Sequence, residues 1–381
     1  MEQMSIFFFF LIIYTYFGYL VLALGLGALR RKRVNKKEIL PSVTLMIAAY
    51  NEERNIVAKL DNCMELDYPA EKLQIAVVSD ASSDQTDQLV LDYPSERVSL
   101  IRVGGRVGKT EARNAAIKQV DSEIVVFSDA TTVYDPKIIK MFVRNFADSE
   151  VGMVTGHLKY IDPKGTQVGA GQKLFWKYEC LLKKAQTFSG TLTGSVGCAS
   201  AFRTKDYTPL PANVIEDFTE PLMMIKKGKR VVFEPEAVCE ELTTEKTGDE
   251  WDMRVRVVRG GLTGLAYAKE LLNPLKYPFV SFQLISHKLL RWFAPVIAIS
   301  LFISCWLEVA LYRDSAFVFF IFSLQLVFYI TALCASLFDS KKGNSKIFSF
   351  AHYFFVVNAA ALTAVYYSFS SELKPTWEPK R

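Results

Sequence analysis

The sequence contains little cysteine, and the few cysteines are not grouped. Its 381 residues include six cysteines, no Cys-x-x-Cys pair occurs, and two of the six lie in strongly apolar runs. Zinc clusters need closely spaced ligands, and small disulfide scaffolds need a regular cysteine framework. The sequence therefore argues against a metal cluster and against a disulfide framework. We expect the cysteines to be small buried hydrophobic residues in a reducing compartment.

The chain also lacks internal repeats, low-complexity segments and a large excess of charge. Its 45 Lys and Arg residues against 40 Asp and Glu residues give a formal net charge of +5. The excess lies beside apolar runs, which indicates contact with anionic lipid rather than with nucleic acid. We therefore expect no nucleic-acid partner, and the sequence does not identify protein partners.

Charged residues are almost absent from four long stretches near the two ends of the chain. These stretches are residues 5–29, 293–312, 315–338 and 347–369. Each has the roughly 20 residues that a helix needs to cross a bilayer. A cleavable signal peptide would begin with positive charge and have a shorter apolar core, whereas this chain begins with Glu2 and its basic cluster follows the apolar run. The first stretch is therefore interpreted as a retained anchor.

The distribution of basic residues predicts which side of the membrane the middle of the chain occupies. The cluster at residues 30–33 follows the first stretch, and basic residues favour the cytoplasmic side. Lysines in the 339–346 link agree with this orientation. Basic residues in the tail after residue 369 disagree with it, so a re-entrant last segment is an alternative.

The region between residues 41 and 278 alternates short apolar runs with helical patterns. The apolar runs are residues 43–49, 75–78, 98–103 and 124–127, and the helical patterns are residues 55–66, 84–91 and 109–120. Buried parallel strands read as continuous apolar runs, and helices connect them. The pattern therefore predicts an α/β domain with a doubly wound, mostly parallel sheet.

Polar residues collect where three of these strands end. Tyr50 and Glu52 follow the first run, Asp80 follows the second and Asp129 follows the last. Ligands of such sheets bind beyond the carboxyl ends of the strands, so we expect a ligand site at this edge. Asp and Asn are also common turn formers and helix caps, which is the alternative interpretation of each position taken singly.

Read together, these residues resemble the family 2 glycosyltransferases, the group that includes cellulose, hyaluronan and chitin synthases. The first block is residues 48–53 with residues 78–84, Ala-Ala-Tyr-Asn-Glu-Glu and Val-Ser-Asp-Ala-Ser-Ser-Asp. The resemblance implies a GT-A fold in which this pair cradles the nucleotide. It implies that Asp80 contacts the uracil or ribose and that Ala48, Tyr50 and Glu52 line the same site.

Two further blocks resemble the parts of the family that hold the donor diphosphate. Residues 108–114 look like the Gly-Lys-x-x-Ala-x-Asn segment, which implies that Lys109, at a helix start, faces the diphosphate. Residues 129–131 stand where the family usually has Asp-x-Asp and binds Mg²⁺ or Mn²⁺. Asp129 is kept as a metal ligand, but Thr131 replaces the second acid. A metal-independent enzyme is therefore an alternative.

The last two blocks resemble the catalytic acid motif and the arginine motif of the family. Glu216-Asp217 resembles the acidic pair whose second member is the general base, which makes Asp217 the expected catalytic residue. Both acids also suit a helix start, and the two interpretations are compatible. Arg259 matches the arginine of the Gln-x-x-Arg-Trp motif, and Arg256 replaces its glutamine. Gly260 replaces its tryptophan, so processive synthesis is unsupported.

These observations divide the chain into four parts. We expect an N-terminal transmembrane helix with its basic flank (1–33), a cytoplasmic catalytic domain (34–278), an interfacial amphipathic helix (279–293) and a C-terminal transmembrane region with its tail (294–381). One N-terminal and about three C-terminal transmembrane helices would then flank the α/β domain. The bacterial inner membrane is the expected location.

The expected function is inverting transfer of a sugar from a nucleotide-sugar, by resemblance a UDP-sugar, to a hydroxyl acceptor on a lipid or polysaccharide. A processive synthase that extrudes its polymer is one alternative. An inactive membrane scaffold that retains the fold is the other, and only Thr131 supports it.

Overall fold

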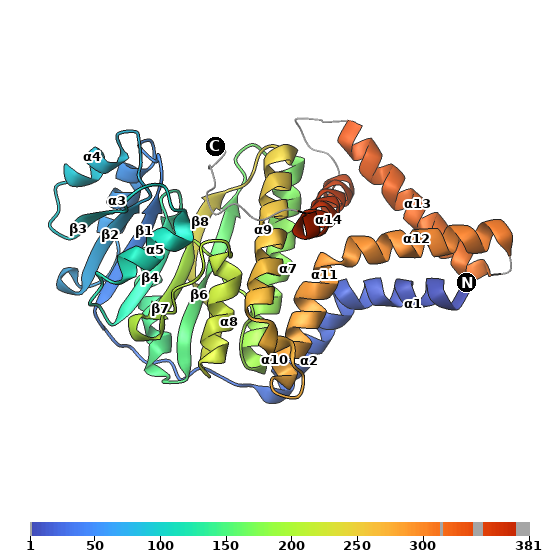
Figure 1. Ribbon diagram of the computed structural model, residues 1–381, viewed down its shortest axis with the longest axis horizontal. Coiled ribbons are helices and arrows are strands. Elements are labelled where there is room, and N and C mark those ends of the chain that lie inside the picture. Colours follow the sequence, from blue (N-terminus) through green and yellow to red (C-terminus); the bar gives the residue numbers. More distant parts are fainter. Residues whose placement is uncertain (1, 313–314, 338–345, 371–381) are drawn as a thin grey trace.

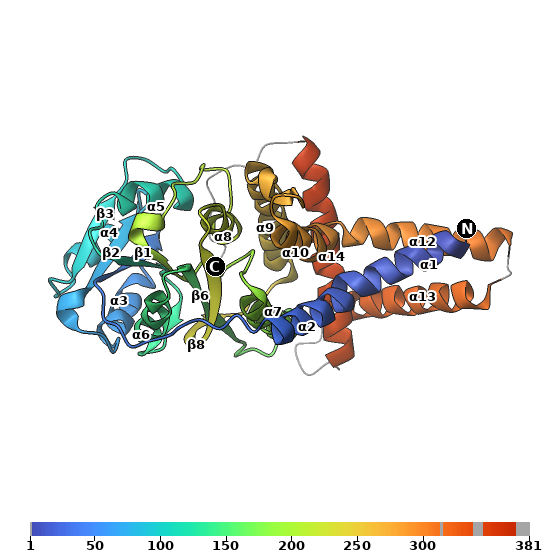
Figure 2. The same ribbon diagram turned by 90° about the horizontal axis from the view of Figure 1, so that it is seen from below.

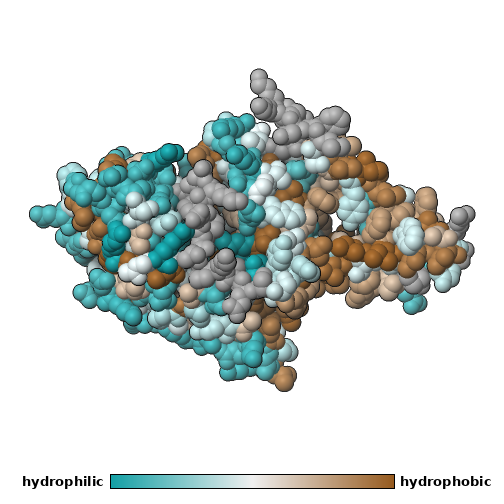
Figure 3. All heavy atoms as spheres, turned by 45° about the horizontal axis from the view of Figure 1, so that its top comes forward, coloured by the Kyte–Doolittle hydropathy of each residue, from teal (hydrophilic) through white to brown (hydrophobic). Residues whose placement is uncertain are grey.

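The molecule is elongated, with an α/β domain at one end and a bundle of apolar helices at the other (Figure 1). The computed structural model describes residues 2–312, 315–337 and 346–370. Most of the 339–346 link and all of the tail after residue 370, on which part of the orientation prediction depends, lie outside the described residues. Hydrophilic surface covers the α/β domain, and hydrophobic surface covers the helical end (Figure 3).

The α/β domain is organised around one eight-stranded sheet with the order β3-β2-β1-β4-β7-β6-β8-β5. The strands are β1 (Val43–Ala49), β2 (Leu73–Ser79), β3 (Val98–Arg102), β4 (Ile124–Asp129), β5 (Val133–Tyr134), β6 (Val151–Ile161), β7 (Ala199–Arg203) and β8 (Arg230–Leu242). The first four strands in the chain are parallel, and β7 is antiparallel to both β4 and β6. The four predicted strands and the α/β sheet are therefore confirmed.

Helices cover both faces of this sheet. They are α3 (Ile56–Met64), α4 (Thr86–Leu91), α5 (Lys109–Ile117), α6 (Ile138–Val143), α7 (Gln167–Ser189), α8 (Glu216–Lys226) and α9 (Thr247–Tyr267). Strand β1 is apolar almost throughout because it is buried on both sides. Its Leu45 and Ile47 pack in one apolar cluster, and Met46 packs in the other, on the opposite face.

Among the residues that the structure describes, four helices are long and apolar enough to cross a membrane, as the sequence predicts. They are Glu2–Arg30, Ala294–Leu311, Ala316–Ser336 and Ile347–Ser370. The first comprises α1 (Glu2–Ile13), a π-helical turn η1 (Tyr14–Gly18) and α2 (Tyr19–Arg30), and the others lie in α12 (Ala294–Leu311), α13 (Ala316–Leu337) and α14 (Lys346–Ser370). The segment between the α/β domain and α12 is α10 (Pro278–Gln283), the π-helical η6 (Leu284–Leu289) and α11 (Leu290–Trp292).

The four apolar helices do not share one direction. Helices α1 and α12 run side by side along the long axis, and α13 runs obliquely beside them (Figures 1 and 2). Helix α14 lies across them, between the bundle and helices α7 and α9 (Figures 1 and 2). The sequence left a re-entrant last segment as an alternative to a fourth parallel span. Helix α14 is not parallel to the other apolar helices, and a re-entrant last segment would also have a different direction from the spanning helices.

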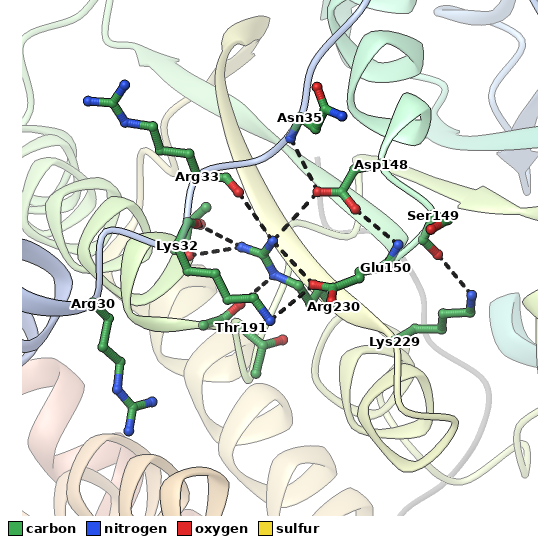
Figure 4. Close-up of polar contacts among 12 residues, drawn as sticks. Arg30, Lys32, Arg33, Asn35, Asp148, Ser149, Glu150, Thr191, Lys229 and Arg230 are labelled. Atoms are coloured by element: carbon green, nitrogen blue, oxygen red, sulfur yellow. Dashed lines mark hydrogen bonds and ion pairs between the residues drawn. The ribbon is translucent and has the colours of Figure 1, made fainter.

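Arg230 connects the basic flank of the first helix to the α/β domain (Figure 4). Its guanidinium donates to the backbone carbonyls of Lys32 at 2.9 Å, Arg33 at 3.5 Å and Gly190 at 2.9 Å. The carboxylate of Asp148 lies 3.7 Å from it. Arg230 is only 6% exposed. One buried side chain therefore fixes the direction in which the chain leaves the membrane helix.

We expect Arg230→Gln to lower the free energy of unfolding by about 2 kcal/mol or more, because it leaves buried carbonyls without donors. The neighbouring Lys229→Gln is the matched control, since Lys229 is half-buried and donates to a single carbonyl, that of Ser149 at 2.9 Å. Its effect should stay within about 0.5 kcal/mol. Denaturant unfolding of both variants in detergent checks this, and equal stabilities would contradict it.

Candidate active site

A cavity of about 1280 Å³ begins at the carboxyl ends of β1, β2 and β4 and extends to the apolar helices. Most of the residues that the sequence singles out line it: Ala48, Tyr50, Glu52, Asp80, Lys109, Asp129, Glu216, Asp217 and Arg256. These residues come from segments far apart in the chain, and the fold brings them to one site. Arg259 is not among the residues that line this cavity.

Asp80 holds the glycine loop that precedes α5. Its two carboxylate oxygens accept backbone N–H groups from Val107 at 2.8 Å and from Gly108 at 3.0 Å. Gly108 has a φ of 90°, a conformation that favours glycine. Tyr50 lies beside this loop, with the Arg106 guanidinium 3.8 Å from its ring centroid. Asp80 therefore positions the loop from which Lys109 extends.

Lys109 and Asp129 form an ion pair at the end of β4. The Lys109 Nζ lies 2.5 Å from the Asp129 Oδ1. The hydroxyl of Thr131, at the position of the missing second acid, donates to the Glu241 carboxylate at 3.4 Å. Across the described residues, no group of three or more His, Cys, Asp and Glu side chains is arranged to hold a metal ion. Asp129 at this place already holds a lysine, and Glu241, which also lines the cavity, accepts from Thr131.

Asp217 lies in the first turn of α8, and the loop before β7 fixes its backbone. Ser195 donates to the Asp217 carbonyl through its backbone N–H at 2.7 Å and through its hydroxyl at 2.8 Å. Burial raises the pKa of Asp217, and the adjacent Glu216 raises it further. A carboxyl group with a raised pKa is suited to accept a proton.

Arg256 and Arg259 on α9 have different surroundings. Arg256 lines the cavity, and its charge lowers the pKa of Asp217 against the larger effect of burial. The Arg259 guanidinium lies 5.8 Å from the ring centroid of Tyr367, on α14. Of the two arginines that the sequence proposes for the donor, the structure therefore brings Arg256 to the other site residues.

Arg113 is the residue beside this site that sequence reasoning did not single out. Its guanidinium donates to the carbonyl of Gly197 at 3.0 Å and lies 3.8 Å from Glu220 and 4.0 Å from Asp129. It is 1% exposed and lies over the Phe127 ring. Arg113 lies within the block 108–114 that resembles the family, and this was the one sequence feature that could have indicated it. The block does not indicate that the Arg113 side chain reaches α8.

A group of charged residues further along the cavity was also not predicted as part of the site. It comprises Glu179 and Lys183 on α7, His287 and Lys288 on η6, and Arg291 on α11. The sequence predicts the last three on the polar face of an interfacial helix. In the structure this face turns inward, and Arg291 pairs with Glu179. His287 is neutral because burial lowers its pKa to about 3.

Comparison with known proteins identifies what this arrangement resembles. Residues 44–208 match glycosyl transferase family 2. A poly-β-1,6-N-acetyl-D-glucosamine synthase of Staphylococcus aureus is 29% identical over 245 residues, which are 61% of this chain and 58% of the relative. The enzyme of the same name from Staphylococcus epidermidis is 27% identical over 228 residues, 58% of this chain and 54% of the relative. The chain thus spans less than two thirds of the length of these relatives.

A solved structure extends the likeness of fold to nearly the whole chain. The mannosyltransferase PcManGT from Pyrobaculum calidifontis, solved in complex with GDP-Man and Mn²⁺, superposes with a TM-score of 0.71. It is 21% identical in sequence, and the alignment covers 96% of this chain and 99% of that one. The shared architecture therefore includes the apolar helices as well as the α/β domain.

We expect Arg113→Gln to lower the free energy of unfolding by about 2 kcal/mol, because it leaves the part-buried Gly197 carbonyl without its donor. Lys118→Gln, an exposed change at the end of the same helix, should be close to neutral. Arg113→Lys should restore part of the loss. Thermal unfolding of the three variants checks this, and an Arg113→Gln protein as stable as the Lys118→Gln control would refute it.

Proposed function

Because residues 44–208 belong to glycosyl transferase family 2, we propose that this protein is an inverting glycosyltransferase embedded in a membrane. It moves a sugar from a UDP-sugar to a hydroxyl acceptor on a lipid or polysaccharide. The observation that carries the proposal is the convergence of Lys109, Asp129, Arg256 and Asp217 on one cavity. The names of the staphylococcal relatives make N-acetylglucosamine the first donor sugar to test.

Asp217 acts as the general base. The acceptor hydroxyl gives its proton to this carboxylate while its oxygen forms a bond to the anomeric carbon. The bond between that carbon and the diphosphate oxygen breaks, and its electron pair leaves with the nucleoside diphosphate. Lys109 and Arg256 offset the charge that develops there, so a second acid is not needed. Attack from the face opposite the leaving group inverts the configuration.

Transfer of one sugar, or a few, agrees better with the site than processive synthesis. Gly260 occupies the place of the family's tryptophan, and a Cβ there would lie only 2.8 Å from the Ile215 Cβ. Helix α9 therefore packs directly on the residue before Glu216, which leaves no room for a tryptophan at position 260. The aromatic side chain beside this helix is instead Trp292, which packs on Phe218 and lines the cavity. The length of the product on a gel separates the two alternatives, and long polymer from the purified chain would favour processive synthesis.

The catalytic domain lies on the cytoplasmic side in this proposal. The support is the basic cluster after the first apolar helix, whose residues 30–33 pack at the boundary between that helix and the α/β domain. Nucleotide-sugars are cytoplasmic substrates in this interpretation, and the bacterial inner membrane supplies the lipid. The segment 279–293 keeps its proposed place near the membrane surface.

Mg²⁺ or Mn²⁺ would be held by Asp129 together with the donor diphosphate and water, since magnesium commonly uses one or two carboxylates plus phosphates. The bound ion would supply positive charge at the leaving group. Asp129 is the one carboxylate that we assign to the ion, since Glu241 accepts from Thr131, and Lys109 is paired with Asp129 at 2.5 Å. The ion and the nucleotide should therefore bind together.

We expect purified protein to bind Mn²⁺ weakly without nucleotide and at least tenfold more tightly with UDP. Electron paramagnetic resonance of free Mn²⁺ measures this, and Asp129→Asn should abolish the difference. Tight binding of Mn²⁺ without nucleotide would contradict the single-carboxylate site.

We expect Asp217→Asn to lower the rate of sugar transfer at least 100-fold while UDP binding stays within about twofold, because the amide cannot accept the proton. In the wild type, kcat/KM should rise with pH and level off above the pKa of Asp217, since only the ionised carboxylate acts as base. That pKa should exceed the ordinary Asp value, because burial raises it. A rate in the mutant equal to that of the wild type would remove Asp217 as base.

A further inference from the structure

The cavity that contains the donor site continues into the apolar helices. Its far part is lined by Phe9 on α1, Leu301 on α12, Leu324 on α13 and Phe354 on α14. These side chains come from all four helices that could span a membrane. The same cavity reaches Asp217 without interruption. A hydrocarbon chain in this part would therefore lead directly to the proposed base.

Two lysines lie where the apolar part of the cavity meets the catalytic part. Lys183, on α7, is only 6% exposed, and Lys288 lies in η6. Both line the cavity. The Lys183 Nζ lies 4.5 Å from the ring centroid of Trp176, and the Lys288 Nζ lies 5.8 Å from that of Phe218. Neither ammonium group makes a hydrogen bond or an ion pair with any described residue.

Lys288 is close to the residue that we propose as base. A Cβ on Gly194 would lie 3.2 Å from the Lys288 Nζ. The next residue, Ser195, holds the backbone of Asp217 with two hydrogen bonds. The absence of a side chain at position 194 thus leaves room for the ammonium group beside the first turn of α8.

The neighbouring charges do not neutralise the two lysines. Glu179 is bound by Arg291, and the charges of both Arg291 and Lys288 hold its carboxyl ionised. His287 stays neutral, since burial lowers its pKa to about 3. Lys183, Lys288 and Arg291 therefore face two carboxyl groups among the described residues, those of Glu179 and Asp217. Burial lowers the pKa of both lysines, that of Lys288 to about 8, and a bound anion would favour their charged forms. Buried charge without a partner is costly, and a bound anion would offset the cost.

We propose that Lys183 and Lys288 bind the phosphate of a phosphorylated lipid acceptor whose hydrocarbon chain lies between α1, α12, α13 and α14. A neutral polysaccharide would need neither the ammonium groups nor the apolar walls. The lipid carries the acceptor hydroxyl, which reaches Asp217 from the same cavity. This inference rests on the proposed function and names the class of its acceptor.

The test uses the full chain in detergent and three probes: a long-chain polyprenyl phosphate, the polyprenol of the same length and inorganic phosphate. Binding is followed by the quenching of tryptophan fluorescence, because Trp176 lies beside Lys183. We expect the polyprenyl phosphate to bind at least tenfold more tightly than the polyprenol. Inorganic phosphate alone should bind more weakly than the polyprenyl phosphate, since it gains nothing from the apolar walls.

The double variant Lys183→Gln, Lys288→Gln should lose this preference for the phosphorylated lipid. Lys184→Gln is the matched control, because Lys184 is the exposed neighbour on the same helix. It should keep the preference in full. UDP affinity should stay within about twofold in all variants, which also shows that the double variant is folded. If the double variant does not fold, the single variant Lys288→Gln and the comparison of lipids on the wild type decide the matter.

Equal binding of polyprenol and polyprenyl phosphate to the wild type would overturn the proposal. The proposal would also be overturned if the double variant lost UDP binding but kept its preference for the phosphorylated lipid. That result would mean that the lysines bind the nucleotide-sugar donor. Failure of the proposed function gives a different result: no sugar is transferred from any nucleotide-sugar, while the preference for the phosphorylated lipid persists.

Discussion

The arrangement of the site depends on one buried cation, the guanidinium of Arg113. It extends from α5, which begins at Lys109, and contacts the carbonyl of Gly197 in the loop that positions Asp217. It also lies near Asp129 at the end of β4 and near Glu220 on α8. Arg113 thus joins the half of the domain proposed to hold the nucleotide to the half that carries the base. Asn114, the next residue on α5, adds hydrogen bonds to the segment before α8, where it donates to the Leu210 carbonyl at 2.7 Å. Any shift of α5 would move both together.

The second constraint is the close approach of helices at glycine. Gly260 lets α9 pack on Ile215, and Gly194 leaves room for Lys288. These contacts bring the acids of α8 and the basic residues of η6 to one cavity. The same close packing excludes a tryptophan at position 260 itself. The contacts at Gly260 and Gly194 therefore limit the space in the cavity and determine which charged side chains line it.

Much of the architecture could be predicted from the sequence because it depends on local patterns. Strands such as Val43–Ala49 are continuous apolar runs, and the helix that starts at Lys109 has its glycine directly before it. The convergence of Tyr50, Asp80 and Asp129 follows from the rule that parallel strands end at one edge. The antiparallel strand β7 and the crosswise direction of α14 could not be predicted, because both depend on contacts between distant segments. For the same reason, the sequence could not show that Arg256 lines the cavity and Arg259 does not. It also could not show that His287 and Arg291 lie against Glu179.

The central claim is inverting transfer with the acceptor hydroxyl activated at Asp217 and the diphosphate leaving on the opposite side. The most direct measurement is the configuration of the new glycosidic bond, read by nuclear magnetic resonance of product made from an α-linked nucleotide-sugar. The account predicts a β-linkage in the first product formed. An α-linkage would contradict it, because a single displacement at the anomeric carbon cannot retain the configuration.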